Sequence, residues 1–267
     1  MRIDDIDPPR EVPGAADTIL RTLEAFHLEW DGELRYQSTR FADYALCAAE
    51  LVERGQAYRC GCTRREISER ARSGPLGPRY PGTCRKRRNT GPSGNVRVVA
   101  DGARGRFHDR LQGECSYDVP ELTGDYVILR RNALPAYHLA VVLDDADQKV
   151  THIVRGADLL ETTGLHIHLQ QTLGLTTPAY CHVPVIVNRA GQKLSKQTGA
   201  QPVGPADVRG RAAEILGYLG LRAPADMSGA PPRELWTWAA ERWTLKPLNT
   251  KTKLPLRADM VGRVEIH

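Results

Sequence analysis

Three cysteines and a tyrosine in one short stretch could hold a metal ion. Cys60 and Cys62 flank a glycine, and Tyr80 and Cys84 follow in a Tyr-Pro-Gly-Thr-Cys run. Thiols grouped in a segment that cannot build a core are typical of a structural zinc site, which needs four ligands. The candidates for the fourth ligand are Tyr80, His108 and Cys115. The alternative is three free thiols in a reducing compartment, because the spacing differs from the usual pair of CxxC hooks.

Two lysines could serve phosphate chemistry. Lys193 and Lys196 flank Leu-Ser in a loop that follows a predicted buried strand. Adenylyl transfer needs cations where negative charge develops on the departing oxygens, and lysine acts there as a point charge. The alternative is a solvated basic loop.

Three further residues could bind a small charged substrate. Asp4 follows a predicted strand and could receive an ammonium group, although a polar turn with helix-capping aspartates is the alternative. Tyr137 lies in the run Pro-Ala-Tyr-His-Leu. Arg155 ends a predicted strand, where open α/β sheets bind ligands, and its guanidinium could hold a carboxylate in a two-pronged pair. The alternative for Arg155 is a structural ion pair with Asp158 or Glu161.

Apolar periodicity predicts the elements that position these residues. β-branched and apolar runs predict strands, and spacings of three and four predict helices. The predicted strands are Val96 to Val99, Arg106 to Arg110, Asp125 to Arg130, Ala136 to Leu143, Thr151 to Val154 and Val183 to Asn188. The predicted helices are Asp17 to Phe26, Phe41 to Arg54, Leu159 to Leu173, Val208 to Leu219 and Pro232 to Trp243. This alternation favours a mostly parallel α/β sheet, with Ser73 to Gly94 as a loop-rich segment and the tail from Thr244 unassigned.

Composition limits the class of protein. The chain has 267 residues, 41% of them hydrophobic and 26% charged, which suffices for one large or two small domains. It contains neither an apolar run of membrane-spanning length nor a signal peptide pattern, and we expect a cytoplasmic protein with no membrane association. The formal charge is +5, with arginines concentrated between residues 64 and 110. That concentration suits a polyphosphate partner, whereas a solvated arginine-rich surface is the alternative.

Four segments together resemble the glutamyl branch of the class I aminoacyl-tRNA synthetases. The matching segments are RIDDIDPPR (Arg2 to Arg10), PAYHLAVVLDD (Pro135 to Asp145), VTHIVRGADLLETT (Val150 to Thr163) and HVPVIVNRAGQKLSKQ (His182 to Gln197). They lie in the family's order and include its KMSKS-type loop in the form KLSKQ. The resemblance implies a Rossmann-like parallel sheet with a zinc-binding insertion and a short helical C-terminal stem.

The resemblance also implies a role for each candidate residue. It implies zinc bound by Cys60, Cys62, Tyr80 and Cys84. It places Asp4, commonly Glu in the family, around the glutamate together with Tyr137 and Arg155. It gives Lys196 contact with ATP and puts Lys193 beside it as a second catalytic lysine, with Mg²⁺ sharing the phosphate charge.

Two features resemble the short branch of this family, which glutamylates queuosine in tRNA(Asp). One is the Asp-Pro-Pro-Arg-Glu continuation together with the cysteine insertion, and the other is the shortness of the chain after KLSKQ, which leaves no room for an ordinary anticodon-reading domain. The implied partners are glutamate, ATP and queuosine-containing tRNA(Asp), and we expect a monomer. The expected organisation is a first catalytic part (1–58), a zinc-binding insertion (59–110), a second catalytic part with the KLSKQ loop (111–204), and a helical stem with an unassigned tail (205–267).

In the family, a strand and a phosphate-binding turn of the SPTG/HIGH type precede the residues that match Arg2. We therefore expect the adenine and ribose cradle to be absent from this sequence, through a late start, a deliberate fragment or a decayed gene. We also expect the sequence as it stands not to form glutamyl-adenylate at a useful rate. The rival functions are a catalytically inactive RNA-binding remnant and a fragment of a glutamyl-tRNA synthetase.

Overall fold

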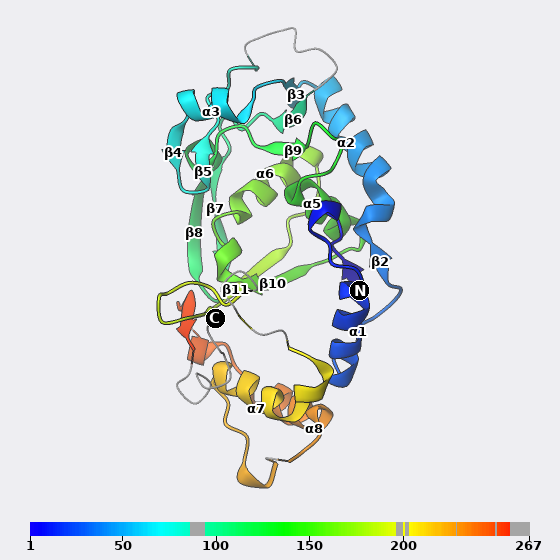
Figure 1. The fold of residues 1–267 in the computed structure, drawn as a ribbon. Coiled ribbons are helices and arrows are strands. Elements are labelled where there is room, and N and C mark those ends of the chain that lie inside the picture. Colours follow the sequence, from blue (N-terminus) through cyan, green and yellow to red (C-terminus); the bar gives the residue numbers. More distant parts are fainter. Residues whose placement is uncertain (86–93, 196–199, 201–202, 228, 249, 257–267) are drawn as a thin grey trace.

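The structure is a computed structural model that describes residues 1–85, 94–195, 200, 203–227, 229–248 and 250–256. Within this part of the chain, helices and short strands alternate, as Figure 1 shows. No helix among these residues combines the length and the apolar character that a bilayer crossing requires.

A four-stranded sheet carries the candidate substrate-binding arginine. Its strand order is β10-β11-β7-β8, in which β10, β11 and β7 run parallel and β8 runs antiparallel to β7. These strands are β7 (Arg104–Asp109), β8 (Gly113–Asp118), β10 (His152–Gly156) and β11 (Ala179–Val183). The parallel part of the expected sheet is therefore present, and its parallel strands end at one edge.

A second, three-stranded sheet packs against helices to form the main core. It has the order β3-β6-β9 with antiparallel neighbours. The strands are β3 (Ala57–Cys60), β6 (Asn95–Val98) and β9 (Val127–Leu129), and the helices are α2 (Phe41–Glu53), α5 (Tyr137–Asp147) and α6 (Thr163–Leu173). Buried Leu51, Val98, Ile128, Leu139 and Leu169 belong to the same hydrophobic cluster.

The C-terminal helices pack beside the first helix, at the opposite end of the molecule from β3, β6 and β9 (Figure 1). The first helix is α1 (Ala15–Ala25), and the C-terminal helices are α7 (Val208–Tyr218) and α8 (Pro232–Arg242). Phe26 is buried together with Leu216 and Leu235, and the Trp236 indole N–H donates to the Phe26 carbonyl oxygen at 2.6 Å. The helical stem is thus attached to the N-terminal part of the chain by a small core of its own.

The tail after Trp243 continues into the fold. Strand β13 (Lys253–Pro255) pairs in parallel with β12 (Val185–Val187), directly before the loop that contains Lys193. The turn Lys246–Leu248 buries Leu248 against Leu111 and Cys181. The sequence of this tail shows no apolar periodicity that would predict a strand, because a three-residue edge strand is too short to show a period.

Shorter elements complete the chain. They are β1 (Arg2–Ile3), β2 (Arg35–Tyr36), α3 (Arg64–Arg70), β4 (Arg72–Gly74), β5 (Gly77–Arg79), α4 (Val119–Leu122) and single 3₁₀ turns. The described part of the loop-rich stretch from Ser73 to Gly94 therefore contains a small hairpin, β4–β5.

Two strand predictions need correction. Ala136 to Leu143 is not a strand, because Tyr137 begins the helix α5. A short apolar run is compatible with either element, and here the helix places Asp144 among buried polar partners. The run from Val183 to Asn188 is divided at Pro184, which lacks the N–H that a continuing strand would donate.

The expected domain boundaries remain predictions. Strands β6 and β7 both fall in the range 59–110, yet β6 pairs with β9 and β7 pairs with β11.

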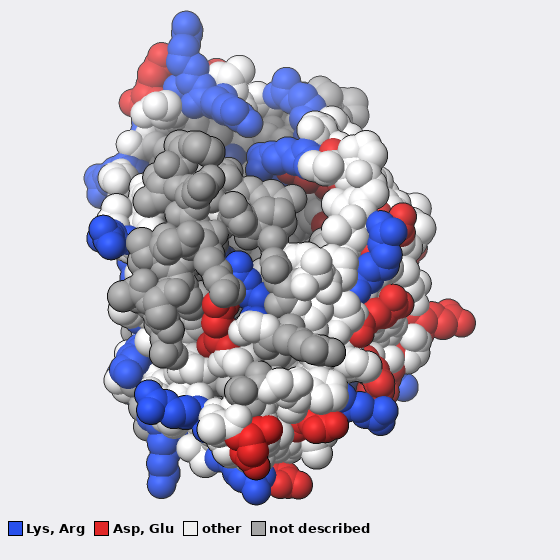
Figure 2. All heavy atoms as spheres, turned by 60° about the horizontal axis from the view of Figure 1, so that its bottom comes forward, with Lys and Arg blue, Asp and Glu red and all other residues white. Residues whose placement is uncertain are grey.

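On the face seen in Figure 2, basic side chains predominate along the left edge and acidic side chains along the lower right.

Asp144 joins α5 to α2, and its loss should destabilise the fold. The residue is 1% exposed, and its carboxylate accepts hydrogen bonds from Gln37 Nε2 (2.7 Å), Tyr44 Oη (2.8 Å) and Arg40 Nη1 (2.7 Å). Asp147, on the same helix, contacts the same Arg40 nitrogen at 3.2 Å but is half exposed. Breaking a buried pair costs about 3 kcal/mol or more, and an exposed pair contributes about 1 kcal/mol or less. Urea unfolding of Asp144→Asn and Asp147→Asn should show this difference, and equal losses would contradict the assignment.

Candidate active site

Arg155 lies where three parallel strands end. It is directly opposite His182 in the β10–β11 ladder, and Asp109 ends β7 on the other side of β11. The carboxyl ends of parallel strands are where open α/β sheets bind ligands. Strand register therefore brings three polar side chains from distant parts of the sequence to this edge.

The guanidinium of Arg155 is held by uncharged acceptors. Its Nε donates to His182 Nε2 at 3.0 Å, Nη1 to His166 Nδ1 at 3.0 Å, and Nη2 to Thr163 Oγ1 at 2.8 Å. The Tyr180 ring centroid is 5.3 Å from Cζ. Among the described residues no carboxylate forms an ion pair with Arg155, so the alternative of a structural pair with Asp158 or Glu161 is wrong.

These contacts fix the tautomers of a chain of histidines. An arginine can only donate, so His182 Nε2 and His166 Nδ1 both accept. His182 Nδ1–H then donates to Asp109 Oδ2 at 2.7 Å, and His166 Nε2–H donates to His138 Nδ1 at 3.0 Å. The relay runs from a buried carboxylate through Arg155 to His138, and every imidazole in it is neutral.

Burial keeps these imidazoles uncharged. Burial and then the charge of Arg155 lower the pKa of His138 to about 4, and burial lowers the pKa of His166 well below its usual value. Burial also lowers the pKa of His182, against the opposing effect of Asp109. Burial alone would raise the pKa of Asp109, but hydrogen bonds from Gln112, His182 and the following backbone hold it below its usual value.

Tyr137 lies beside this cluster, and Asp4 lies within electrostatic range of Tyr137. Tyr137 is the first residue of α5, and its ring is 5.7 Å from the His166 ring. Burial raises the pKa of Tyr137, Arg155 lowers it and Asp4 raises it. Asp4 is exposed and accepts a hydrogen bond from Arg2 Nε at 2.8 Å. A carboxylate beside Arg155 would thus meet a guanidinium and a phenol together.

The lysine loop reaches the same strand edge. Lys193 Nζ is 2.5 Å from Asp158 Oδ2, and Asp158 follows β10 by two residues. A bridge between Val187 and Lys193 folds the loop back onto β12. Lys196 lies outside the described residues.

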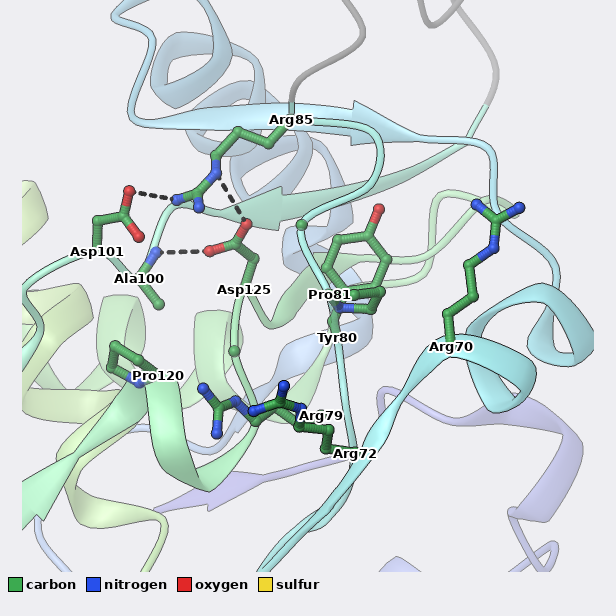
Figure 3. A pocket seen from close by; sticks show the side chains of 12 residues that line it. Arg70, Arg72, Arg79, Tyr80, Pro81, Arg85, Ala100, Asp101, Pro120 and Asp125 are labelled. Carbon is green, nitrogen blue, oxygen red and sulfur yellow. Dashed lines mark hydrogen bonds and ion pairs between the residues drawn. The ribbon is translucent and has the colours of Figure 1, made fainter.

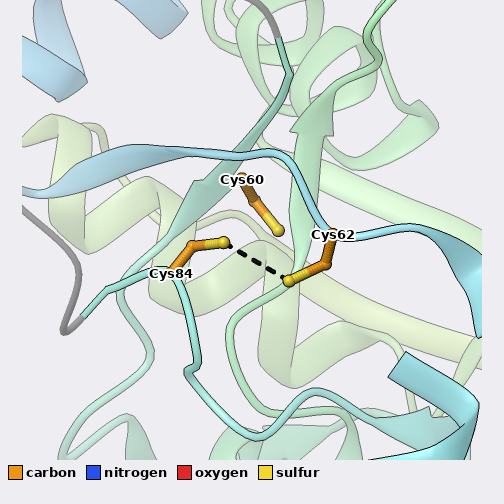
Figure 4. A group of neighbouring side chains, drawn as sticks. All are labelled: Cys60, Cys62 and Cys84. Atoms are coloured by element: carbon orange, nitrogen blue, oxygen red, sulfur yellow. Dashed lines mark hydrogen bonds between the residues drawn. The ribbon is translucent and has the colours of Figure 1, made fainter. Parts of the chain in front are cut away.

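The three cysteines converge as Figure 4 shows. The sulfur atoms of Cys60, Cys62 and Cys84 lie within 4.8 Å of one another, and these residues could hold a metal ion. Cys62 Sγ is 3.3 Å from Cys84 Sγ, and the Tyr80 hydroxyl is 3.2 Å from Cys60 Sγ and 3.7 Å from Cys62 Sγ. Burial alone would raise the pKa of Cys84, but hydrogen bonds from Tyr80 and Cys62 lower it to about 7.

Of the three candidates for the fourth ligand, Tyr80 contacts the thiols. His108 is exposed and bonded to Glu114, and Cys115 lies in the β7–β8 hairpin outside the cluster. Buried Arg97 stacks on the Tyr80 ring, with Cζ 3.9 Å from the centroid, and its Nη1 donates to the Asp125 carbonyl oxygen at 2.7 Å. Arg97 makes no ion pair with any carboxylate that the structure describes.

Sequence reasoning did not identify the residues that hold Arg155. His182, His166 and Thr163 contact Arg155 directly, and Asp109 and His138 contact the first two of these. Two of these histidines lie within segments that matched the family, yet no spacing linked them to Arg155. A histidine in the otherwise apolar strand Ala179–Val183 is the signal that could have identified His182, because such a group is buried only with partners.

Comparison with known proteins gives strong matches. The family model described as tRNA synthetases class I (E and Q), catalytic domain, matches residues 1–216. Proteins named glutamyl-Q tRNA(Asp) synthetase from Chromobacterium violaceum and Aromatoleum aromaticum are 50% and 47% identical to this chain. The first alignment covers 92% of this chain and 82% of the relative, and the second covers 92% and 78%.

Solved structures give the same fold. A glutamate tRNA ligase from Elizabethkingia meningosepticum superposes with a TM-score of 0.74 at 23% identity, and the glutamate-tRNA synthetase of Elizabethkingia anophelis with 0.73 at 22%. Each covers 97% of this chain, which spans about 60% of the length of those proteins. These likenesses confirm the expected Rossmann-like α/β fold.

The neutral histidines predict acid sensitivity. A histidine with a lowered folded pKa binds fewer protons in the folded than in the unfolded chain between the folded pKa and about 6.5. Above about pH 6.5 such a group does not lower the free energy of unfolding. As the pH falls from there toward the folded pKa, each group lowers the free energy of unfolding by up to about 1.4 kcal/mol per pH unit.

Urea unfolding between pH 7.5 and 4.5 should therefore show a falling free energy of unfolding, with a smaller slope in His138→Gln, whose amide oxygen can still accept from His166. His152→Gln, at an exposed position, should keep the wild-type slope. Identical slopes in all three proteins would contradict the assignment of a neutral relay.

Proposed function

Because this chain belongs to the family of class I tRNA synthetases for glutamate and glutamine, we propose that it activates glutamate with ATP and transfers it to queuosine in tRNA(Asp). The observation that carries the proposal is the Arg155 guanidinium, held at the strand edge without a carboxylate partner among the described residues and beside Tyr137. The names of its relatives supply the acceptor, queuosine in tRNA(Asp).

The proposed reaction has two steps. An α-carboxylate oxygen of glutamate attacks the α-phosphorus of ATP, and the bond to the pyrophosphate oxygen breaks. A hydroxyl oxygen of the queuosine cyclopentene ring then attacks the activated carbonyl carbon, AMP leaves, and the hydroxyl proton is lost. Positioning and electrostatics suffice for both steps, without a covalent protein nucleophile.

Each residue at the edge has a proposed part in binding. Arg155 and Tyr137 take the side-chain carboxylate of glutamate, and Asp4 takes its ammonium group. Asp4 is one methylene shorter than the usual glutamate, and its hydrogen bond with Arg2 orients it. Lys193 and Lys196 neutralise the phosphates, with Mg²⁺ sharing their charge, and Asp158 holds Lys193 ready.

We also propose that Cys60, Cys62, Tyr80 and Cys84 bind one zinc ion. Tetrahedral zinc with bonds of about 2.3 Å to sulfur separates its ligand atoms by roughly 3.8 Å, close to the separations in this cluster. Three thiolates and a phenolate would leave the site negative, and buried Arg97 lies against it as the compensating cation. The ion would hold the segment together rather than enter the reaction.

A tRNA substrate suggests a cytoplasmic location. The monomeric state remains a prediction.

The substrate assignment predicts that Arg155→Ala raises the KM for glutamate by roughly 30-fold or more, because a charge-assisted pair is removed. Arg110→Ala, an exposed arginine beside the end of β7, should leave that KM within about twofold. The measurement is glutamate-dependent ATP–pyrophosphate exchange without tRNA, followed by transfer to queuosine-containing tRNA(Asp).

The assay uses the 267-residue chain and a fusion that carries the phosphate-binding turn of a curated relative before it. Exchange by the fusion alone fits the expectation that this turn positions ATP, and robust exchange by the chain itself contradicts it. Equal activation of glutamine and glutamate would contradict the assignment of glutamate as the substrate. Exchange from neither protein, with tRNA still bound, would favour the RNA-binding remnant.

The metal assignment predicts about one zinc per chain in protein purified without chelator. Cys62→Ser should lose the ion, and Arg97→Met should release it to a chelator faster because the compensating charge is removed. Arg64→Gln, which removes an exposed charge near Cys62, should behave as wild type. Full zinc retention by Cys62→Ser, measured by elemental analysis, would show that these residues are not the ligands.

A further inference from the structure

A hollow lined by four arginines lies beside the cysteine cluster. Its volume is about 240 Å³, and Arg70, Arg72, Arg79 and Arg85 all line it (Figure 3). Tyr80 lines it as well, so the metal segment and the hollow share a wall. Neither the glutamate chemistry nor the cysteine cluster uses these four arginines.

Two of these arginines oppose each other across a hairpin. Arg72 of β4 and Arg79 of β5 are register partners, and like charges directly opposite in a β-ladder are destabilising. Arg79 is paired with Glu121, whereas neither Arg72 nor Arg70 has a partner among the residues that the structure describes. A hairpin that carries this repulsion gains stability when an anion lies between the two guanidinium groups.

The acidic groups of the hollow are already engaged. Arg85 Nη1 is 2.7 Å from Asp101 Oδ2, and its Nε is 3.6 Å from Asp125 Oδ2. Asp125 also accepts from Tyr58 Oη at 2.6 Å and from the Ala100 amide at 2.9 Å. In Figure 3 these groups lie on the side of Arg85, apart from Arg70, Arg72 and Arg79. The uncompensated positive charge is therefore at Arg70 and Arg72.

A phosphate group is the anion that this arrangement fits. Guanidinium groups bind phosphate through paired N–H donors, which makes arginine better suited than lysine to a fixed phosphate. The aromatic ring in the wall, Tyr80, is stacked against Arg97, and the two arginines without an ion-pair partner among the described residues, Arg70 and Arg72, are exposed. Such a site reads backbone charge and shape rather than base identity.

We propose that this hollow binds a backbone phosphate of the RNA substrate, which rests on the proposed function for the identity of that RNA. Its wall is the segment from Tyr80 to Arg85, which also supplies two members of the cysteine cluster. Gly124 lets this wall approach closely, because a Cβ there would lie 2.5 Å from the Tyr80 carbonyl oxygen. The position of the phosphate site is thus tied to the order of the metal segment.

The test compares Arg70→Gln, Arg72→Gln and the double variant with Arg54→Gln, which removes the exposed arginine directly after α2. The ligand is a tRNA(Asp) transcript without queuosine, so that binding is measured apart from transfer. Affinity is measured by filter binding across a range of salt concentrations.

The double variant should bind the transcript roughly 10-fold or more weakly. The slope of log affinity against log salt is negative, and its magnitude should decrease by about one for each phosphate that the variant no longer binds. Arg54→Gln should change neither quantity. Unchanged zinc content and circular dichroism in each variant would exclude a folding defect.

An unchanged affinity and slope in the double variant would overturn the proposal. Inorganic phosphate that protects wild type but not the double variant against thermal unfolding, with tRNA binding intact in both, would also overturn it by assigning the hollow to a free anion. Weakened tRNA binding in the double variant supports the phosphate site even if transfer to queuosine fails in the wild type, so the two proposals fail separately.

Discussion

The arrangement at the strand edge depends on one constraint: a guanidinium is kept at the end of a strand with no ion-paired carboxylate from the residues that the structure describes. His166, His182 and Thr163 hold Arg155 through neutral acceptors, and the nearest negative charge in the relay, Asp109, contacts His182 instead. An ion pair would hold the side chain equally well but would cancel its charge. Neutral imidazoles fix the orientation of the cation and preserve its attraction for an incoming carboxylate.

That constraint explains why the strand order matters. Arg155, His182 and Asp109 come from three strands, and they meet because β10, β11 and β7 are parallel neighbours that end together. Helices α5 and α6 bring His138 and His166 to the same point. The tail contributes through β13, which extends the strand pairing beside the lysine loop. The strand edge around Arg155 is therefore assembled from long-range pairings rather than from a contiguous motif.

The cysteines were singled out by residue type and spacing, and Arg155 and Tyr137 by the family resemblance. The structure brings the three sulfur atoms together and places Tyr137 beside the residues that contact Arg155, while their roles remain predictions. The histidine relay could not be predicted, since it depends on which residue of β11 faces Arg155 and on the depth of α6 beneath the sheet. The strand prediction for Ala136 to Leu143 was wrong for a related reason. Its apolar residues fit a strand or a helix, and only the partners of Asp144 select the helix.

The central claim is tested most directly by a crystal structure of the protein with glutamate bound. The account predicts the side-chain carboxylate within hydrogen-bonding distance of the Arg155 guanidinium and the Tyr137 hydroxyl, with the bonds to His166 and His182 retained. Glutamate bound elsewhere, or Arg155 turned away to pair with Asp158, would contradict it.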